Sequence, residues 1–348
     1  MNNAFGLIDN LAVEHSLTVG EYKMLIDSIS PDVTAYLTEK AIEARKSIYS
    51  NKVFIRGLIE ISNICKNDCY YCGIRRSNKN CDRYRLSSDE ITECCIEGYS
   101  LGFRTFVLQG GEDSYFTDET LCEIIRKIKS NCPGCAVTLS LGERSYDSYK
   151  KLFDAGADRY LLRHETATES HYNKLHPDSM NFLKRMDCLD MLKEIGFQVG
   201  CGFMVGSPFQ SADDIARDLK FIEEFSPDMC GIGPFIPHKD TEFANHSAGS
   251  AEITCHLLSI IRLIKPNILL PATTALGTVN SDGRENGIKA GANVIMPNLS
   301  PQSVRKKYML YDNKLSDGDE SANNLSKLKN KMLNIGYEIV TDRGDIIK

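Results

Sequence analysis

The first fifty residues show apolar positions at helical spacing. A possible capping box formed by Thr18 and Glu21 precedes one such run, and a second helix is predicted from about Asp32 to Tyr49. This region shows no catalytic pattern. We therefore expect residues 1–50 to form a helical brace beside the rest of the chain.

From residue 51 onward, short apolar runs alternate with amphipathic segments. Eight runs read as strands, at Val53–Ile61, Thr105–Leu108, Ala136–Leu141, Arg159–Arg163, Gln198–Met204, Met229–Ile232, Ile268–Thr274 and Val294–Met296. Helix-like segments separate them, and several end at a glycine that suits a helix C-cap: Gly102, Gly156, Gly196 and Gly291. This alternation predicts an α/β fold, a (β/α)8 or TIM barrel, with a six-strand partial barrel as the alternative.

No linker, repeat or low-complexity segment interrupts this pattern. We expect a barrel at 51–311 and a C-terminal extension at 312–348 that packs on it. The net charge of −6 argues against a broad nucleic-acid surface. No apolar run approaches a membrane span, and residues 1–6 lack the features of a secretory signal, so a cytoplasmic protein without a membrane partner is expected.

Cysteine usage points to one metal site. The chain has 13 cysteines, an odd number spread along its length, which does not suggest a disulfide scaffold. Only Cys65, Cys69 and Cys72 cluster, in the loop after the first strand. Three thiolates at this spacing can hold a four-iron cluster and leave one iron open for a ligand. The same spacing is the signature of radical S-adenosylmethionine (radical SAM) enzymes.

Active sites of such barrels lie at the C-terminal ends of the strands, where the cysteine loop also opens. The second strand ends in Gly110-Gly111-Glu112, and glycines there allow close approach of a ligand to the backbone. Thr138 and Ser140 share one face of the third strand, which suggests a lined cavity and not only packing.

The fourth strand carries unusual charge. Arg159, Arg163 and Glu165 share one face, and if that face points inward they line the barrel. Buried charges are costly unless they are paired or used, so the two arginines indicate an anionic ligand. A structural ion-pair network is the alternative.

Other cysteines are interpreted more simply. Cys81 could be a fourth ligand, although an exposed loop thiol is the simpler interpretation. Cys132 and Cys135 resemble a redox or zinc pair but have no second pair, and their loop leads into a strand, away from the expected site.

The motifs together resemble the HydE-type radical SAM maturases of [FeFe]-hydrogenase, over roughly residues 50–311. The motifs that carry the resemblance are Cys65-Lys-Asn-Asp-Cys69-Tyr-Tyr-Cys72, Leu108-Gln-Gly-Gly-Glu-Asp113, Arg159-Tyr-Leu-Leu-Arg-His-Glu-Thr-Ala167, Gly231-Ile-Gly-Pro-Phe-Ile-Pro-His238, Pro271-Ala-Thr-Thr-Ala275 and Gly291-Ala-Asn-Val-Ile-Met-Pro-Asn298. The resemblance implies a full barrel with a [4Fe-4S] cluster and S-adenosyl-L-methionine (SAM) at its top.

The resemblance also implies roles for particular residues. Those that would surround SAM are Gln109, Gly110, Gly111, Glu112, Thr138, Ser140, Glu165, Arg185, Met204, Ile236, Tyr308, Leu310 and Tyr311. Those that would bind substrate are Arg159, Arg163, Thr273 and Thr274. Glu165 would offer its carboxylate to SAM, and Arg159 and Arg163 would anchor anionic groups of the substrate.

The implied activity is reductive cleavage of SAM to a 5′-deoxyadenosyl radical, with a flavodoxin or ferredoxin as electron donor. The substrate would be a small organometallic iron species that bears cysteine, carbon monoxide and cyanide, and the product would pass toward a scaffold maturase of the hydrogenase. Some family members carry a second cluster near the C-terminus, but here no cysteine follows Cys255, so one cluster is expected.

The sequence leaves two alternative functions open. A methylornithine synthase, a radical SAM mutase on lysine with a related barrel, would bind the two ends of an amino acid. A non-catalytic iron–sulfur protein would show a fourth nearby thiolate and would not cleave SAM.

Overall fold

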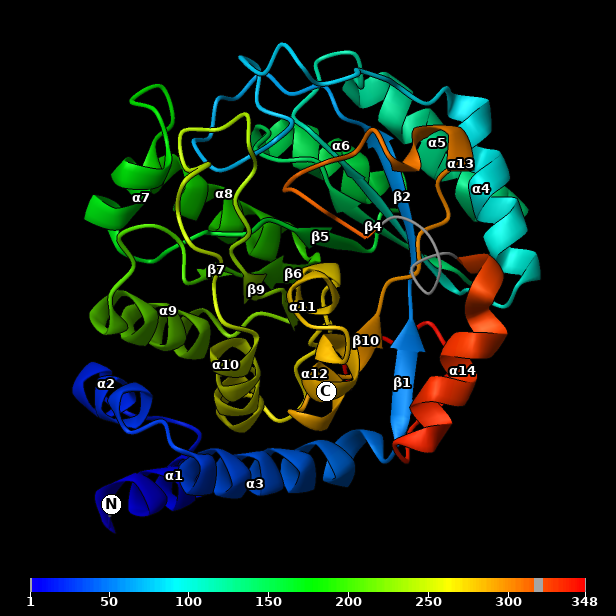
Figure 1. The fold of residues 1–348 in the computed structure, drawn as a ribbon. Coiled ribbons are helices and arrows are strands. Elements are labelled where there is room, and N and C mark those ends of the chain that lie inside the picture. The colour runs from blue at the N-terminus through cyan, green and yellow to red at the C-terminus, as the bar shows by residue number, and fades with distance from the viewer. Residues whose placement is uncertain (1, 316–321, 348) are drawn as a thin grey trace.

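The N-terminal region of the computed structural model, which describes residues 2–315 and 322–347, is helical. It contains α1 (Asn2–Glu14), α2 (Val19–Asp27) and α3 (Pro31–Tyr49). The Thr18 hydroxyl accepts from the Glu21 backbone N–H, and the Glu21 carboxylate accepts from the Thr18 N–H, so the predicted capping box is confirmed. Helix α2 packs on α9 (Ala212–Phe225) and α3 on α10 (Ala251–Ile264), outside the barrel (Figure 1).

Six parallel strands form the first part of the barrel wall. In spatial order they are β2 (Gly57–Ser62), β3 (Thr105–Gly110), β4 (Ala136–Ser140), β5 (Arg159–Leu161), β6 (Gln198–Cys201) and β8 (Met229–Cys230). The other helices of the outer layer are α4 (Ser88–Ser100), α5 (Asp118–Asn131), α6 (Tyr146–Asp154), α7 (Glu169–Leu175), α8 (Phe182–Ile195), α11 (Thr274–Val279) and α12 (Gly283–Lys289). Figure 1 shows the helices arranged around the strands.

The remaining wall closes the barrel. Met229 forms a parallel bridge with Leu269, and Pro271 forms one with Val294, so residues 269–271 take the place of the seventh strand. The eighth strand, β10 (Val294–Ile295), pairs in parallel with β1 (Lys52–Ile55), which runs on into β2. The predicted (β/α)8 barrel is therefore confirmed, and the six-strand alternative is wrong.

Several predicted strands are interrupted. The strand expected at Val53–Ile61 is divided at Arg56, although the Arg56 N–H still donates to the Ile295 carbonyl. The fifth and sixth strands stop and restart as β7 (Met204–Val205) and β9 (Gly233–Pro234). The cause is a close backbone approach, because a Cβ on Gly202 would lie 2.1 Å from the Gly231 carbonyl oxygen.

The C-terminal region returns to the first strand. After α13 (Gln302–Arg305), η2 (Ala322–Asn324) and α14 (Leu325–Asn334), the strand β11 (Glu338–Val340) pairs in parallel with β1. The predicted extension at 312–348, and the segment at 314–325 where no second cluster is expected, lie partly outside the described residues. Within the described residues, no helix is both long and apolar enough to cross a membrane.

Candidate active site

The cysteine loop is fixed to the ends of neighbouring strands. The Lys66 N–H donates to the Glu112 carbonyl at 3.0 Å, and the Glu112 N–H points to the Cys65 sulfur at 3.4 Å. A Cβ on Gly111 would lie 2.3 Å from the Ile64 carbonyl oxygen and 2.8 Å from the Cys65 Cβ. The glycine is therefore required for the loop to approach β3, a role that sequence reasoning had assigned to ligand contact.

The three predicted cluster ligands converge. Burial raises the pKa of the Cys72 thiol to about 12, and the nearby Cys65 raises it further. Burial, Cys72 and Cys65 likewise raise the pKa of Cys69 well above its usual range. Buried thiols that repel one another as anions become thiolates when cationic metal binds, so this arrangement fits an iron–sulfur cluster.

The charges that act on the Cys81 thiol are Arg83, Asp82 and Asp240, and none of the three predicted ligands is among them. The Cys81 sulfur accepts a weak hydrogen bond from the Asn63 side chain at 3.5 Å. In the part of the chain that the structure describes, no group of three His, Cys, Asp or Glu side chains could hold a single metal ion. The pair Cys132 and Cys135 is buried in the outer layer, with both thiols free.

The end of β5 places two charged side chains at the site. Arg163 Nη2 lies 3.1 Å from Glu165 Oε2, yet neither atom makes a hydrogen bond, and Arg163 Nε has no partner either. Glu165 has φ 67°, a left-handed conformation that a non-glycine residue adopts at a cost of about 1–3 kcal/mol. Spare hydrogen-bonding capacity on a strained residue is typical of a ligand site.

Arg185 connects this strand end to its neighbours. From the first turns of α8 it donates to the Glu143 carboxylate at 2.7 Å and to the Arg163 carbonyl at 3.1 Å. Burial opposes its charge, but the combined interactions with Glu143, Tyr172 and Tyr71 outweigh burial and raise the pKa of Arg185 above its ordinary value. Arg185 lowers and Glu165 raises the pKa of the Cys69 thiol, so both charges act on the cysteine loop.

Polar groups from β3 and β4 complete this side. The Gln109 amide donates to the Tyr308 hydroxyl at 3.4 Å. Thr138 is buried and its hydroxyl oxygen has no partner, while Ser140 ends β4 half-buried. Register pairs Glu60 with Gln109, and Gln109 with Ser140, so these side chains share one face of the sheet.

The remaining predicted SAM residues border the site. Met204 packs in a small apolar cluster with Tyr70 and Tyr71 of the cysteine loop. The Leu310 carbonyl accepts from the Gly73 N–H at 2.8 Å and so supports the loop from behind. Two half-buried residues, Ile236 and Tyr311, lie in the loops that follow β9 and α13.

The seventh strand contributes its two threonines at the start of α11. The Thr273 hydroxyl oxygen is buried without a hydrogen-bond partner and faces Gly233, where a Cβ would approach to 2.7 Å. Thr274 is the first residue of α11, and its carbonyl accepts from the Thr278 hydroxyl. Thr273 thus adds to the partnerless buried polar atoms of the barrel.

Arg159 is not part of this site. It donates to Thr105 Oγ1 and Gln198 Oε1, each at 3.0 Å, to Asp345 at 2.6 Å and to the Arg343 carbonyl at 2.9 Å. Thr105, Arg159 and Gln198 are the first residues of their strands, so Arg159 lies at the N-terminal end of the barrel, opposite the cysteines. The expectation that it lines the substrate cavity is corrected: a structural ion-pair network holds it.

Sequence reasoning missed a buried ion pair beside the site. Lys314 Nζ lies 2.7 Å from Glu60 Oε1, both side chains are buried, and the Asn298 amide donates to Glu60 Oε2 at 2.9 Å. The ammonium also lies 5.3 Å from the centre of the Tyr308 ring. A lone carboxylate within a buried apolar strand was the available signal for Glu60.

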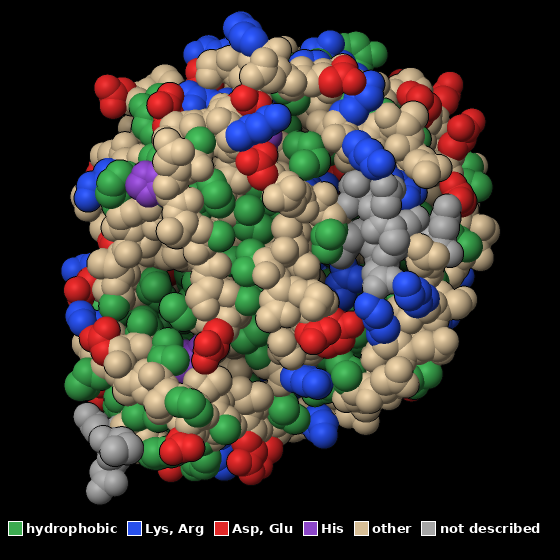
Figure 2. Space-filling model, in the orientation of Figure 1, with side chains coloured by type: hydrophobic (Ala, Val, Ile, Leu, Met, Phe, Trp, Pro, Cys, Tyr) green, Lys and Arg blue, Asp and Glu red, His purple; other side chains and the backbone are tan. Residues whose placement is uncertain are grey.

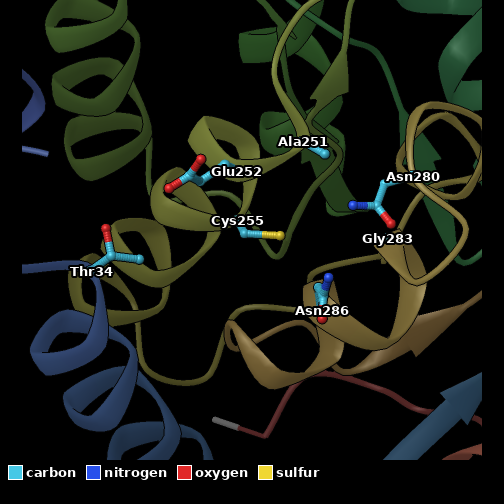
Figure 3. A pocket seen from close by; sticks show the side chains of 7 residues that line it. All are labelled: Thr34, Ala251, Glu252, Cys255, Asn280, Gly283 and Asn286. Carbon is cyan, nitrogen blue, oxygen red and sulfur yellow. The ribbon is translucent and has the colours of Figure 1, made fainter. Parts of the chain in front are cut away.

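A separate hollow lies away from the cysteines. Its volume is about 220 Å³, between α3, α10 and the α11–α12 region, and Cys255, Asn280 and Asn286 point into it (Figure 3). None of the predicted site residues lines it. We therefore assign the chemistry to the cysteine-bearing end of the barrel.

Known proteins are similar to this chain in sequence and in fold. Residues 59–222 match the family model described as the Radical SAM superfamily. The chain is 47% identical to the [FeFe] hydrogenase maturase subunit HydE of Thermotoga maritima, over 80% of this chain and 79% of that protein. It is 27% identical to 3-methylornithine synthase of Methanosarcina acetivorans, over 89% and 88% of the two chains.

Solved structures resemble the whole chain. Methylornithine synthase (PylB) gives a TM-score of 0.85 at 25% identity and covers 96% of this chain and 97% of its own. HydG, a maturase of the [FeFe]-hydrogenase, gives a TM-score of 0.83 over 98% of this chain and 76% of its own, and at 20% identity it shows the fold alone. The fold, the three-cysteine loop and the family match define a radical SAM enzyme. Within that superfamily, the chain belongs to the HydE family of [FeFe] hydrogenase maturases.

Proposed function

We propose that this enzyme binds a [4Fe-4S] cluster through Cys65, Cys69 and Cys72 and cleaves SAM during assembly of the diiron site of [FeFe]-hydrogenase. The single observation that carries the proposal is the convergence of these three thiols beside Glu165 and Arg185. When bound, the cluster and SAM supply a 5′-deoxyadenosyl radical by one-electron cleavage of the sulfonium S–C5′ bond.

The chain's own residues bind and orient SAM. Glu165 Oε2 makes no hydrogen bond and has only the Arg163 guanidinium 3.1 Å away, so it suits the ribose hydroxyls or the sulfonium charge of SAM. The Thr138 hydroxyl is a further free donor at this face. Arg185 holds the Arg163 carbonyl and so fixes the strand end that carries Glu165. The residues proposed to complete the SAM pocket are Gln109, Gly110, Gly111, Glu112, Ser140, Met204, Ile236, Tyr308, Leu310 and Tyr311.

The substrate in this proposal is a cysteine-bearing Fe(CO)2(CN) species. Its cyanide and carboxylate groups are anionic, and Arg163 offers Nε, which has no hydrogen-bond partner, and Nη2, which has only the Glu165 carboxylate 3.1 Å away. Thr273 adds a partnerless hydroxyl, and Thr274 lies next to it at the start of α11. Arg159 is left out, because all three of its nitrogens donate within the protein.

A methylornithine-synthase-like mutase is the second candidate. The whole-chain likeness to PylB supports it. The identity to the HydE of Thermotoga maritima is much higher, 47% against 27%, and favours the maturase. The non-catalytic alternative is set aside, because the chain belongs to a family of enzymes.

The test uses anaerobically reconstituted protein with SAM and dithionite. We expect about four irons per chain and formation of 5′-deoxyadenosine, and Cys69→Ser should abolish both. Cys81→Ser is the matched control and should retain both. Deletion in the host should eliminate hydrogenase activity. Lysine-dependent formation of methylornithine with intact hydrogenase activity would instead support the mutase.

A further inference from the structure

The segment that carries the cluster cysteines is strongly basic. Residues 64–85 contain six lysines or arginines and only two aspartates, a net charge of +4 in a chain of net charge −6. Four of these basic side chains are exposed and are called the basic collar: Lys66, Arg76, Lys79 and Arg85. The rest of the chain is therefore acidic, and positive charge gathers at the cysteines.

The collar and the cysteines form one folded unit. The Arg76 N–H donates to the Asn67 carbonyl at 2.9 Å, and the Asp68 carboxylate accepts from the Ser77 N–H at 3.0 Å. Arg83 turns inward and donates to backbone carbonyls of the loop, so it braces the segment and is not part of the collar. The collar charges thus keep a fixed position relative to the cysteines.

Flanking loops reduce this charge without reversing it. They add basic residues at Lys239, Lys306 and Lys307, and acidic residues at Asp240, Glu242 and Asp312, which balance. Glu112 and Asp113 form ion pairs with Lys66 at 3.0 Å and with Arg85 at 2.7 Å, so the least compensated charges of the collar are those of Arg76 and Lys79. Figure 2 shows Lys and Arg side chains, with Asp and Glu side chains among them, along the upper edge, where the long loop between β2 and α4 lies in Figure 1.

We propose that the basic collar is the docking surface for an acidic one-electron carrier protein. This inference rests on the proposed function. One electron leaves the reduced flavin or iron–sulfur centre of the carrier and enters the cluster held by the neighbouring cysteines, and no bond forms between the proteins. The otherwise acidic chain repels such a carrier, so the collar steers it to the one face that brings the two redox centres close.

The test reverses two collar charges in the full-length protein. Arg76→Glu with Lys79→Glu is compared with Arg126→Glu with Lys289→Glu, which reverses one exposed arginine and one exposed lysine outside the collar. We expect the Kd for oxidised flavodoxin to rise at least ten-fold at about 20 mM salt in the collar variant only, with little difference at about 300 mM. Ferredoxin is measured in parallel to identify which carrier binds.

Activity then separates this inference from the proposed function. Flavodoxin-driven SAM cleavage should fall about ten-fold in the collar variant, whereas cleavage with dithionite should match wild type. The milder Arg76→Gln with Lys79→Gln removes the two charges without reversing them, so its effect should lie between those of the wild type and the collar variant. It also avoids placing a carboxylate beside Asp68, with which Arg76 pairs. Equal carrier binding by the collar and control variants would overturn the docking surface. If hydrogenase activation fell in the collar variant while carrier binding stayed equal, the docking surface for the carrier would likewise be overturned. The collar would then be assigned to the scaffold maturase. Absence of SAM cleavage in every arm would overturn the proposed function instead.

Discussion

Arg159 is the first residue of β5 and Arg163 lies two residues beyond the last, so the two arginines lie toward opposite ends of the barrel. Arg159 is fully buried and all of its nitrogens donate to protein partners. Arg163 is one third exposed and leaves Nε and Nη2 without a hydrogen bond, although Glu165 lies 3.1 Å away. Composition does not distinguish these arginines. Their unused hydrogen-bonding capacity does, and it separates a structural charge from one prepared for a ligand.

The largest effect on activity should come from replacing Arg163, the arginine with unused hydrogen-bonding capacity. Arg163→Leu should reduce hydrogenase activation roughly 100-fold, because lost charge-assisted hydrogen bonds of ~3 kcal/mol correspond to that factor. Its thermal stability should stay near wild type. Arg163→Lys serves as the control and should restore part of the activity, since it keeps the charge but not the planar fork. Wild-type activity of the Arg163→Leu protein would show that Arg163 does not bind a ligand and does not differ in this respect from Arg159.

The structural arginine should show the opposite pattern. Arg159→Met should lower the free energy of unfolding by about 2–3 kcal/mol, below the usual cost of breaking a buried pair, because Asp345 can regain solvent. Urea unfolding measures this. At temperatures where the variant is folded, SAM cleavage should match wild type. A loss of activity without a loss of stability would contradict the structural assignment.

The partner of Arg159 adds a pH dependence. Burial opposes ionisation of Asp345, but Arg343 and Arg159 outweigh it and hold the pKa of that carboxyl well below its usual range. The folded state therefore favours the carboxylate, and this stability is present above the ordinary pKa of 3.8 and declines as the pH falls below it. Thermal melts of cluster-free wild type and Asp345→Asn should differ at neutral pH and converge in acid. A constant difference would argue against the ion pair.

The smallest effect should appear at Thr138. Thr138→Val removes a buried hydroxyl without a partner, so stability should be unchanged or up to about 1 kcal/mol higher. SAM affinity should fall about five-fold, as for one lost hydrogen bond of ~1 kcal/mol. Equilibrium binding and thermal melts check the two effects together. Equal SAM affinity would show that the hydroxyl only fills space.

The sequence was sufficient for the barrel and for the cysteine loop. Apolar runs between glycine-capped helices marked the strands, and local spacing marked Cys65, Cys69 and Cys72. Alternation also placed Arg159 and Arg163 on the same face. It could not give their positions along the barrel axis, which depend on the stagger of the strands. The position of Arg159 also depends on the C-terminal segment, whose Asp345 binds it from far away in the sequence.

Other parts of the site had no local signal. Lys314 reaches Glu60 from beyond the barrel, and nothing around Lys314 indicates that its ammonium is buried. The interrupted fifth and sixth strands were also missed, because the close approach of Gly202 and Gly231 is a property of two strands and not of either one. Pairwise geometry of this kind appears only once the chain has folded.

The pairing of β1 with β10 also sets an order of events in folding. Phe54 has Val294 as its strand partner, so the barrel stays open along this seam until nearly the whole chain has collapsed. Contacts between such distant residues form slowly, and until then β1 presents a free edge to other molecules. Closure of the barrel wall should therefore be the rate-limiting step in folding of this chain. Chains truncated before the eighth strand should aggregate.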